Sequence, residues 1–290
     1  MLILATQNCF HLARRLEKYK HARLLRYACK QFADGERYYR LDFQRQPKSL
    51  VLLANITPDP GSLFDLLALA RAAQDSGIAI EALCIPYLAY SRQDRQSEKG
   101  EAVLARMVAE AINRIPARQR VFVDLHSDAV RAMLAPHREL SCLPWLVHTS
   151  MAQAFDLVVA PDAGAAERAR SVAGNAPVLI MRKHRPRPNQ VRRSATAYPV
   201  KGKRVLMVDD MVDTGRTIAS AAVLLKKQGA RSISVVATHA VFSAPSHKAL
   251  ASAPIWKIIV SDTLAGRAPH GVRVVSITQQ LAEALNSERN

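Results

Sequence analysis

One stretch of the chain constrains the fold more strongly than any other, because an apolar run, a short acidic segment and a helical pattern follow one another directly. It runs from Lys203 to Gln228 and reads KRVLMVDDMVDTGRTIASAAVLLKKQ. Residues 204–208 are the short apolar run that a buried parallel strand needs, and residues 218–225 resume at helical spacing. The sequence therefore predicts a strand, an acidic turn and a helix.

The predicted turn is suited to a phosphorylated sugar. Its N–H groups and the positive end of the helix dipole form an anion-binding concavity, while carboxylates beside it accept hydrogen bonds from sugar hydroxyls or hold Mg²⁺. The candidate residues are Asp209, Asp210, Asp213, Thr214, Gly215, Arg216 and Thr217. The GxxxxGK[ST] spacing of a P-loop is absent, and the simpler alternative is an ordinary strand-to-helix turn capped by Asp.

Strand and helix patterns alternate along the rest of the chain. The segments predicted as strands are residues 2–5, 49–54, 78–85, 121–124, 155–160, 178–181, 232–238, 255–260 and 272–276. Helical spacing occurs at residues 63–73, 102–112 and 165–172, and a last helix follows the final strand. This alternation predicts an α/β fold with mainly parallel sheets.

The length of the chain and the spacing of its cysteines limit the classes of protein to which it can belong. A chain of 290 residues is long enough for two domains, and a hydrophobic fraction of 49% favours a globular protein. The four cysteines have neither CxxC nor CxxH spacing, which argues against a zinc site or a disulfide framework and fits a reducing compartment. No apolar run approaches the length of a membrane span. We therefore expect an untargeted, cytoplasmic protein with no membrane partner.

The formal net charge of +17 raises the alternative of a nucleic-acid binder. The basic residues are spread along the chain, however, and aromatic residues make up only 6% of it. No interleaved basic and aromatic platform and no recognition-helix pattern is present. We expect polyphosphate substrates to account for part of the charge and a solvated surface for the rest, with no nucleic-acid partner.

Polar residues follow three further predicted strands, which is where open α/β sheets bind their ligands. The candidates at these strand ends are Arg92, Gln93 and Asp94, then His126, and then Asp162. Asp162 opens a second small-residue turn before a helix, which repeats the phosphate-binding geometry. A lone histidine after a strand is more often structural than a ligand, so that alternative stays open for His126.

Two segments away from these strand ends also fit a purely structural interpretation. Phe32, Asp34 and Glu36 surround Gly35 in a predicted loop, which taken alone favours a surface turn. Residues 182–193 read RKHRPRPNQVRR, a cationic segment that prolines make unsuitable for a helix. It is predicted as a loop, and the alternatives are a solvated surface or a nucleic-acid arm.

The Lys203–Gln228 stretch resembles the 5-phosphoribose loop of type I phosphoribosyltransferases, and five further segments narrow the resemblance. They are FADGE at 32–36, PYLAYSRQDR at 86–95, VDLHSD at 123–128, VVAPDAGAAERAR at 158–170 and KHRPRPN at 183–189. In this order they resemble the ribose-phosphate pyrophosphokinase family across nearly the whole chain. The resemblance implies two tandem type I phosphoribosyltransferase-like domains, each with a mainly parallel sheet flanked by helices.

The same resemblance implies domain limits and partners. The expected domains are residues 1–142, which carry the ATP loops, and residues 143–290, which carry the ribose 5-phosphate loop. Whether the last helix packs back on the first domain is left open. The active site is expected between the domains of a homo-oligomer, a dimer or larger, with the ATP site shared between subunits.

By this resemblance each motif receives a role. Mg²⁺ is the implied cofactor, ATP and ribose 5-phosphate are the implied substrates, and phosphoribosyl pyrophosphate and AMP are the products. The implied ATP-binding residues are Phe32, Asp34, Glu36, Arg92, Gln93 and Asp94; the implied metal ligands are His126 and Asp162; and the implied catalytic residues are Lys183 and Arg185. The acidic turn at 209–217 is assigned to ribose 5-phosphate.

Three positions depart from the family pattern. Arg216 stands where a glycine is usual, Ala165 where the second glycine of a pair is usual, and His184 where an arginine is usual. Ala165 is tolerated less well than Gly if the backbone there needs a positive φ. The alternatives are therefore a phosphoribosyltransferase, an enzyme running the AMP-consuming reverse reaction, and a non-catalytic regulatory paralogue.

Overall fold

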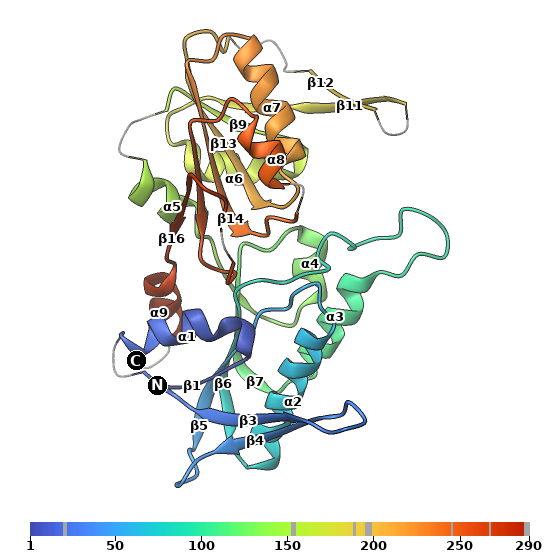
Figure 1. The fold of residues 1–290 in the computed structure, drawn as a ribbon, viewed down its shortest axis with the longest axis vertical. Helices are drawn as coiled ribbons and strands as arrows, with labels where there is room; N and C mark the ends of the chain where they lie inside the picture. Colours follow the sequence, from blue (N-terminus) through green and yellow to red (C-terminus); the bar gives the residue numbers. More distant parts are fainter. Residues whose placement is uncertain are drawn as a thin grey trace. The chain divides into compact units, whose positions relative to one another are not determined.

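The computed structural model shows two compact units, each built around its own parallel sheet (Figure 1). Unit 1 comprises Met1–Leu140 and the segment that begins at Ile277, and unit 2 comprises Ser141–Ser276. The structure describes residues 1–19, 22–151, 155–187, 190–194, 199–244, 246–266 and 268–286. No side chain is described between residues 182 and 194.

The sheet of unit 1 has six strands, which are all parallel and run in the order β2-β1-β5-β6-β7-β8. The strands are β1 Leu2–Ala5, β2 Arg23–Leu24, β5 Ser49–Leu53, β6 Ala79–Ile85, β7 Ala117–Val123 and β8 Arg138–Leu140. Strand β5 and the second half of β6 are runs of buried apolar residues, whereas in β7 only residues 121–123 are buried.

Helices connect and cover these strands. They are α1 Phe10–Glu17, which follows the 3₁₀ turn Gln7–Cys9, then α2 Gly61–Asp75, α3 Leu104–Asn113, α4 Asp128–Met133 and the C-terminal α9 Thr278–Asn286. The carbonyl of Ala284 in α9 accepts hydrogen bonds from the side chains of Gln119 on β7 (3.5 Å) and Arg138 on β8 (3.3 Å). The last helix is therefore part of unit 1.

An antiparallel hairpin, β3 Arg26–Gln31 and β4 Arg37–Asp42, forms a separate small sheet of unit 1. Aromatic contacts hold its base: Tyr27 lies 6.1 Å from Phe10 of α1, and Tyr39 lies 6.4 Å from Phe64 of α2, between ring centroids. Arg37 donates to Asp65 at 2.6 Å. The hairpin tip extends beyond these anchors (Figure 1).

Unit 2 repeats the architecture with the parallel order β10-β9-β13-β14-β15-β16. Its strands are β9 Leu157–Ala160, β10 Val178–Ile180, β13 Arg204–Val212, β14 Ser232–Ala240, β15 Lys257–Ser261 and β16 Val272–Val275. Its helices are α5 Leu143–Ser150, the 3₁₀ turn η2 Ala163–Ala165, α6 Ala166–Ala173, α7 Arg216–Lys227 and α8 Ser246–Ala251.

Alternating side chains of this sheet enter two cores. Leu157 and Val159 of β9 join one apolar cluster with Ile218 and Leu225 of α7, whereas Val158 between them joins a second cluster that α5 and α6 cover. The α7 residues that enter the core, Ile218, Ala221, Ala222 and Leu225, have the spacing of one helix face. The predicted alternation of strands and helices is confirmed.

The cationic segment predicted as a loop is instead a two-stranded antiparallel hairpin, β11 Arg182–Arg187 and β12 Gln190–Ser194. The register shifts between His184 and Arg187, so the ladder passes Pro186 at an irregularity. Proline excludes a helix interior, but it is tolerated in a strand where its missing N–H is not needed by the ladder.

Candidate active site

The acidic segment of unit 2 lies at the carboxyl edge of the sheet, beside the turn that follows β9. Asp209 and Asp210 lie on β13 itself, because pairing with β14 continues through Asp209↔Ala237 to Val212↔Ala240. The predicted strand, which ended at residue 208, was therefore four residues too short. Since β9 and β13 are parallel neighbours, the turn that begins at Asp162 lies next to these carboxylates.

Arg168 of α6 joins the two segments. Its guanidinium lies 3.8 Å from the carboxylate of Asp210 and donates to the carbonyl of Gly164 at 2.9 Å. Asp210 is only 2% exposed, so this cation offsets a carboxylate that burial would otherwise destabilise. Asp162 in turn accepts from the N–H of Gly164 at 3.1 Å. The turn after β9 and the end of β13 are thus held in one arrangement.

Asp209 has an unusual charge environment. Burial and the neighbouring carboxylate of Asp210 raise the pKa of Asp209 well above its ordinary value, and Asp162 adds to the effect. The N–H of Asp210 donates to Asp209 at 3.0 Å and acts in the opposite direction. A ligand that offers hydrogen-bond donors or positive charge here would relieve the repulsion.

The segment from Asp213 to Thr217 forms the start of α7. Gly215 has φ +69°, and a Cβ placed on it would lie 2.8 Å from Cγ of Leu250, so glycine is required for two reasons. Thr214 and Thr217 are half-buried and Arg216 is exposed. The free N–H groups of a helix's first turn and its dipole favour an anion at this point.

In unit 1 the loop after β6 meets the turn after β7. The hydroxyl of Ser127 donates to Asp94 at 2.6 Å. The same oxygen accepts from Val130 N–H and so caps the N-terminus of α4. Asp94 therefore lies beside the turn that carries His126, and both side chains are half-buried. Arg92 and Gln93, next to Asp94, are exposed.

The FADGE segment is the tip of the β3–β4 hairpin. Phe32 N–H donates to Glu36 O at 2.8 Å, Glu36 N–H donates to the carboxylate of Asp34 at 3.0 Å, and Gly35 takes φ +96°. Phe32 is 56% exposed and lies 6.2 Å from Tyr38, between ring centroids. One carboxylate of the motif thus shapes the turn, and a large aromatic ring is presented to solvent.

The structure groups only some of the predicted residues. Unit 2 brings together Asp162, Asp209 and Asp210 and places the 213–217 turn at the same edge, while unit 1 brings together Asp94 and the His126 turn. Lys183, His184 and Arg185 lie on β11, and their side chains are outside the described part of the chain.

Two features of the strand ends escaped sequence reasoning. Tyr90 (φ 66°), Asp124 (φ 39°) and Phe242 (φ 42°) take left-handed backbone conformations after β6, β7 and β14. Such conformations are costly for non-glycine residues and cluster at functional sites. His239 and Thr263, 3.0 Å apart, belong to a buried polar group beside the end of β13. No sequence pattern reports φ, although Asp124 lies within the VDLHSD segment.

A divalent cation fits the chemistry of these carboxylates only in part. Oxygen ligands are what Mg²⁺ prefers. The described residues nevertheless hold no group of three or more His, Cys, Asp or Glu side chains arranged to bind a metal. Mg²⁺ often binds through only one or two protein carboxylates, together with water and substrate phosphates.

The comparison with known proteins identifies the family. A family model described as the N-terminal domain of ribose phosphate pyrophosphokinase matches residues 1–115, and one described as the phosphoribosyl synthetase-associated domain matches residues 171–290. A ribose-phosphate pyrophosphokinase of Chromobacterium violaceum is 32% identical over 290 residues, covering 96% of this chain and 89% of that protein. The chain belongs to the ribose-phosphate pyrophosphokinase family.

Other ribose-phosphate pyrophosphokinases are similarly related. The protein of Aquifex aeolicus is 31% identical over 263 residues, which cover 88% of this chain and 85% of that protein. The crystal structure of phosphoribosylpyrophosphate synthetase from Mycobacterium smegmatis is 28% identical, with a TM-score of 0.88, and the match covers 99% of this chain and 98% of that chain. The predicted fold class, α/β with two phosphoribosyltransferase-like halves, is confirmed.

Within the ribose-phosphate pyrophosphokinase family, two of the unusual residues fit the local backbone. Ala165 has φ −90° and is buried, so the turn does not need glycine there. Arg216 is the first residue of α7 and is exposed, so its side chain leaves the space around Gly215 unobstructed.

Proposed function

We infer that this chain catalyses the transfer of the β,γ-diphosphoryl group of Mg-ATP to ribose 5-phosphate, giving phosphoribosyl pyrophosphate and AMP. The oxygen of the ribose 1-hydroxyl attacks the β-phosphorus of ATP. The bond from that phosphorus to the oxygen bridging to the α-phosphate breaks, and the hydroxyl proton is released to the surroundings. Family membership and the acidic edge of unit 2 support this reaction.

The observation that carries the proposal is that two adjacent, mutually repelling carboxylates lie beside a helix N-terminus that can bind an anion. Asp209 and Asp210 lie on β13, and α7 begins at Arg216 after a turn that only glycine fits at position 215. A sugar phosphate offers hydroxyl donors to the carboxylates and an anion to the N–H groups of the turn. Asp213, Thr214 and Thr217 add side-chain oxygens at the same turn.

The ATP-binding roles rest on the loops of unit 1. Arg92 and Gln93 are exposed beside Asp94, which Ser127 holds at 2.6 Å. Arg92 is suited to a phosphate, because a guanidinium binds phosphate oxygens through two parallel hydrogen bonds. At the hairpin tip, the exposed ring of Phe32 is suited to stacking on a base. Asp34 and Glu36 would complete that contact.

Lys183 and Arg185 would stabilise the transferring group. Diphosphoryl transfer depends on positioning and charge neutralisation, which cationic side chains on a hairpin beyond the sheet are suited to supply. Mg²⁺ held by substrate phosphates, with Asp162 and His126 as candidate protein ligands, would neutralise the phosphate charge and orient it.

We further propose that the active enzyme is a homo-oligomer that works in the cytoplasm. Phe32 directly follows β3 at the hairpin tip and is 56% exposed, which suits a contact with a second subunit's nucleotide. All four cysteines, which the structure describes, are free thiols, as expected in a reducing compartment. Among the described residues, no helix is long and apolar enough to cross a bilayer.

The direct test is product analysis of the purified protein incubated with Mg-ATP and ribose 5-phosphate. We expect AMP and phosphoribosyl pyrophosphate to accumulate in equal amounts, and we expect neither product when ribose 5-phosphate or Mg²⁺ is omitted. An Asp210→Asn variant is the matched control, because it removes one carboxylate charge with little change of shape. Formation of ADP, or no turnover, would contradict the proposal and favour another transferase or a regulatory paralogue.

A further inference from the structure

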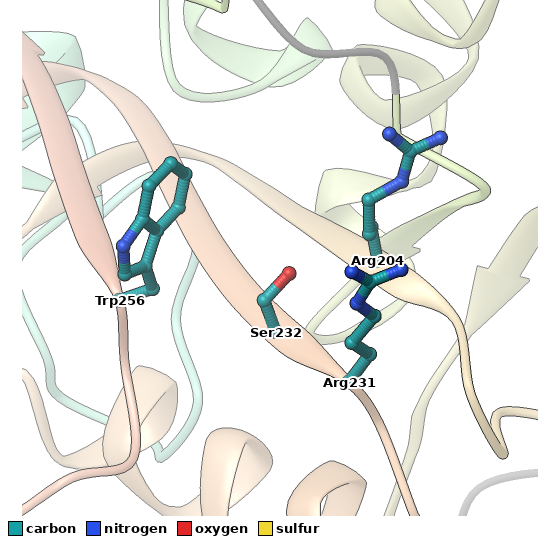
Figure 2. Close-up of a pocket in the computed structure, with 4 residues that line it drawn as sticks. All are labelled: Arg204, Arg231, Ser232 and Trp256. Carbon is teal, nitrogen blue, oxygen red and sulfur yellow. The ribbon is translucent and has the colours of Figure 1, made fainter.

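A hollow of about 540 Å³ lies at the edge of the unit 2 sheet opposite the acidic site. Arg204 and Ser232 are the first residues of β13 and β14 and pair directly with each other, whereas the acidic site is at the other ends of these parallel strands. Trp256 directly precedes β15, and its backbone N–H donates to the backbone carbonyl of Ile233 at 2.8 Å. Figure 2 shows these side chains and Arg231 around the hollow.

Trp256 is the apolar component of this hollow. Its side chain is 65% exposed, so a large aromatic face that burial would stabilise is left in contact with water. The other described lining residues, Arg204, Arg231 and Ser232, are polar or charged. Tryptophan is enriched at binding interfaces, and its ring stacks favourably on another aromatic ring.

The charge of the hollow is positive. Arg204 is neutralised by Asp156 through two side-chain hydrogen bonds of 3.1 and 2.8 Å, and this pairing holds the pKa of Asp156 well below its ordinary range. Arg231 is exposed and has no carboxylate partner among the described residues. The ammonium group of Lys226 lies 3.3 Å from the carbonyl oxygen of Arg231 and adds positive charge nearby.

We propose that this hollow binds an aromatic anion of the class to which nucleoside monophosphates belong. The ring stacks on Trp256, the anionic group binds the Arg231 guanidinium, and the Ser232 hydroxyl lies between them. Arg231 and Trp256 immediately precede the neighbouring strands β14 and β15, whose backbones are roughly 4.8 Å apart, so one small ligand can reach both side chains.

A mononucleotide fits this hollow better than a nucleic-acid strand. Single strands bind along grooves in which several aromatic side chains and a row of cations follow the backbone. In the described part of the chain, the lining residues of the hollow supply one aromatic ring and one cation that is not already paired with a carboxylate. The arrangement therefore has the components for one base and one phosphate.

Tryptophan fluorescence can report on this hollow alone. The chain has two tryptophans, Trp145 on α5 and Trp256. Within the part of the chain that the structure describes, the indole nitrogen of Trp145 is buried without a hydrogen-bond partner, so Trp145→Phe removes no hydrogen bond there. In that variant we expect adenosine 5′-monophosphate to quench the remaining fluorescence saturably. Adenosine and inorganic phosphate, each carrying half of the required chemistry, should bind at least about tenfold more weakly.

Two further variants in the Trp145→Phe background complete the test. Arg231→Gln should weaken the quench at least about tenfold, because it removes the charge-assisted hydrogen bond to the anion. Arg170→Gln removes the same charge from an exposed site on α6 and should leave the titration within about twofold. Equal quenching by adenosine, an unchanged titration in Arg231→Gln, or displacement by oligothymidylate with steep salt dependence would overturn the proposal.

This titration does not depend on catalysis. Saturable quenching in a protein without turnover would support the hollow and contradict the diphosphokinase proposal. Normal turnover without any quenching would support the diphosphokinase proposal and contradict ligand binding at the hollow. Arg231 and Trp256 belong to neither set of proposed active-site residues, so Arg231→Gln is expected to retain activity.

Discussion

Asp209 shows how a residue can be unfavourable for stability and suitable for binding. Burial and the carboxylates of Asp210 and Asp162 oppose its ionisation, and Arg168 compensates Asp210 and not Asp209 in the described contacts. Before the substrate arrives, the site therefore carries a carboxylate whose charge is poorly compensated. Hydroxyl donors of a sugar would supply what the protein leaves out.

We expect Asp209→Asn to raise the melting temperature of the ligand-free protein at neutral pH. The folded-state pKa of Asp209 lies above its unfolded value, so its favourable contribution is complete below the unfolded pKa and is lost as the pH rises through the folded pKa. The variant should lack that loss. Thermal unfolding between pH 4 and 8 measures it.

Glu167→Gln is the matched control for this measurement. Glu167 is exposed in the first turn of α6, where a negative charge is favourable by about 0.3–1 kcal/mol, so its loss should not stabilise the protein. If Asp209→Asn melts at or below the wild-type temperature across this range, the carboxylate repulsion has been assigned wrongly.

Lys183 is the residue for which we predict the largest kinetic effect. Lys183→Ala should lower kcat by about 100-fold or more with little change in KM, because the cation would act chiefly in the transition state. Steady-state kinetics with both substrates measure this. Lys227→Ala, which removes an exposed cation at the far end of α7, is the control. An unchanged kcat removes Lys183 from the mechanism, and tight salt-sensitive DNA binding would favour a nucleic-acid arm.

At the scale of elements, the site depends on how β13 passes into α7. The strand extends to Val212 because β14 pairs with it that far, and Phe242 N–H donates to Val212 O at 2.9 Å just beyond. The helix then begins at Arg216 after the left-handed Gly215. The carboxylates are thus fixed on a strand, and only residues 213–215 form the connection, which keeps the helix start close to the acids.

Gly215→Ala should destabilise the protein by about 1–3 kcal/mol from its backbone conformation alone. Contact with Leu250, which a Cβ would approach to 2.8 Å, should add to the loss. Gly202→Ala separates the two effects, because Gly202 also has positive φ (+75°) but no atom within 4 Å of the added Cβ. Urea unfolding of both variants measures the difference. Equal losses would mean that Leu250 does not restrict position 215.

At the scale of the whole molecule, the chain repeats one architecture twice and divides the candidate chemistry between the copies. Unit 1 carries the proposed ATP loops and the β3–β4 hairpin, and unit 2 carries the acidic edge and the β11–β12 hairpin. Both sheets present these residues after the carboxyl ends of parallel strands. The two hairpins are the exceptions, since neither β3–β4, with its tip at residues 32–36, nor β11–β12 belongs to a parallel sheet.

Subunit mixing tests whether that tip serves a second subunit. If each site combines residues from two chains, mixing inactive Asp34→Ala with inactive Lys183→Ala should restore part of the activity, up to about a quarter of the sites in a two-fold assembly with random exchange. Activity after mixing, together with light scattering, measures this. Glu36→Ala is a second hairpin variant that leaves the Asp34 hydrogen bond intact. Monomeric behaviour, or no recovery after verified exchange, would contradict the shared site.

The sequence by itself determined the α/β class, most of the parallel strands and the residues at the strand ends, whereas the β3–β4 hairpin and the helices α1, α4, α5 and α8 were not predicted. Apolar runs, helical spacing and the VDDMVDTGRT segment depend on local chemistry that each residue carries wherever it lies. The residues at which the strands and helices begin and end were less predictable. The strand at Asp209 and Asp210 extends because of pairing with β14, and the cationic segment forms a hairpin because of a partner strand, neither of which composition reveals.

Only the tertiary structure decided which charges meet. The contact of Arg168 with Asp210, the 2.6 Å hydrogen bond from Ser127 to Asp94 and the hollow at Trp256 all join residues distant in sequence. The raised pKa of Asp209 depends on burial, which the tertiary structure also sets. The left-handed Tyr90, Asp124 and Phe242 likewise depend on surroundings that impose a costly conformation. Burial and Coulomb energy depend on three-dimensional distance, and a linear motif does not contain that distance.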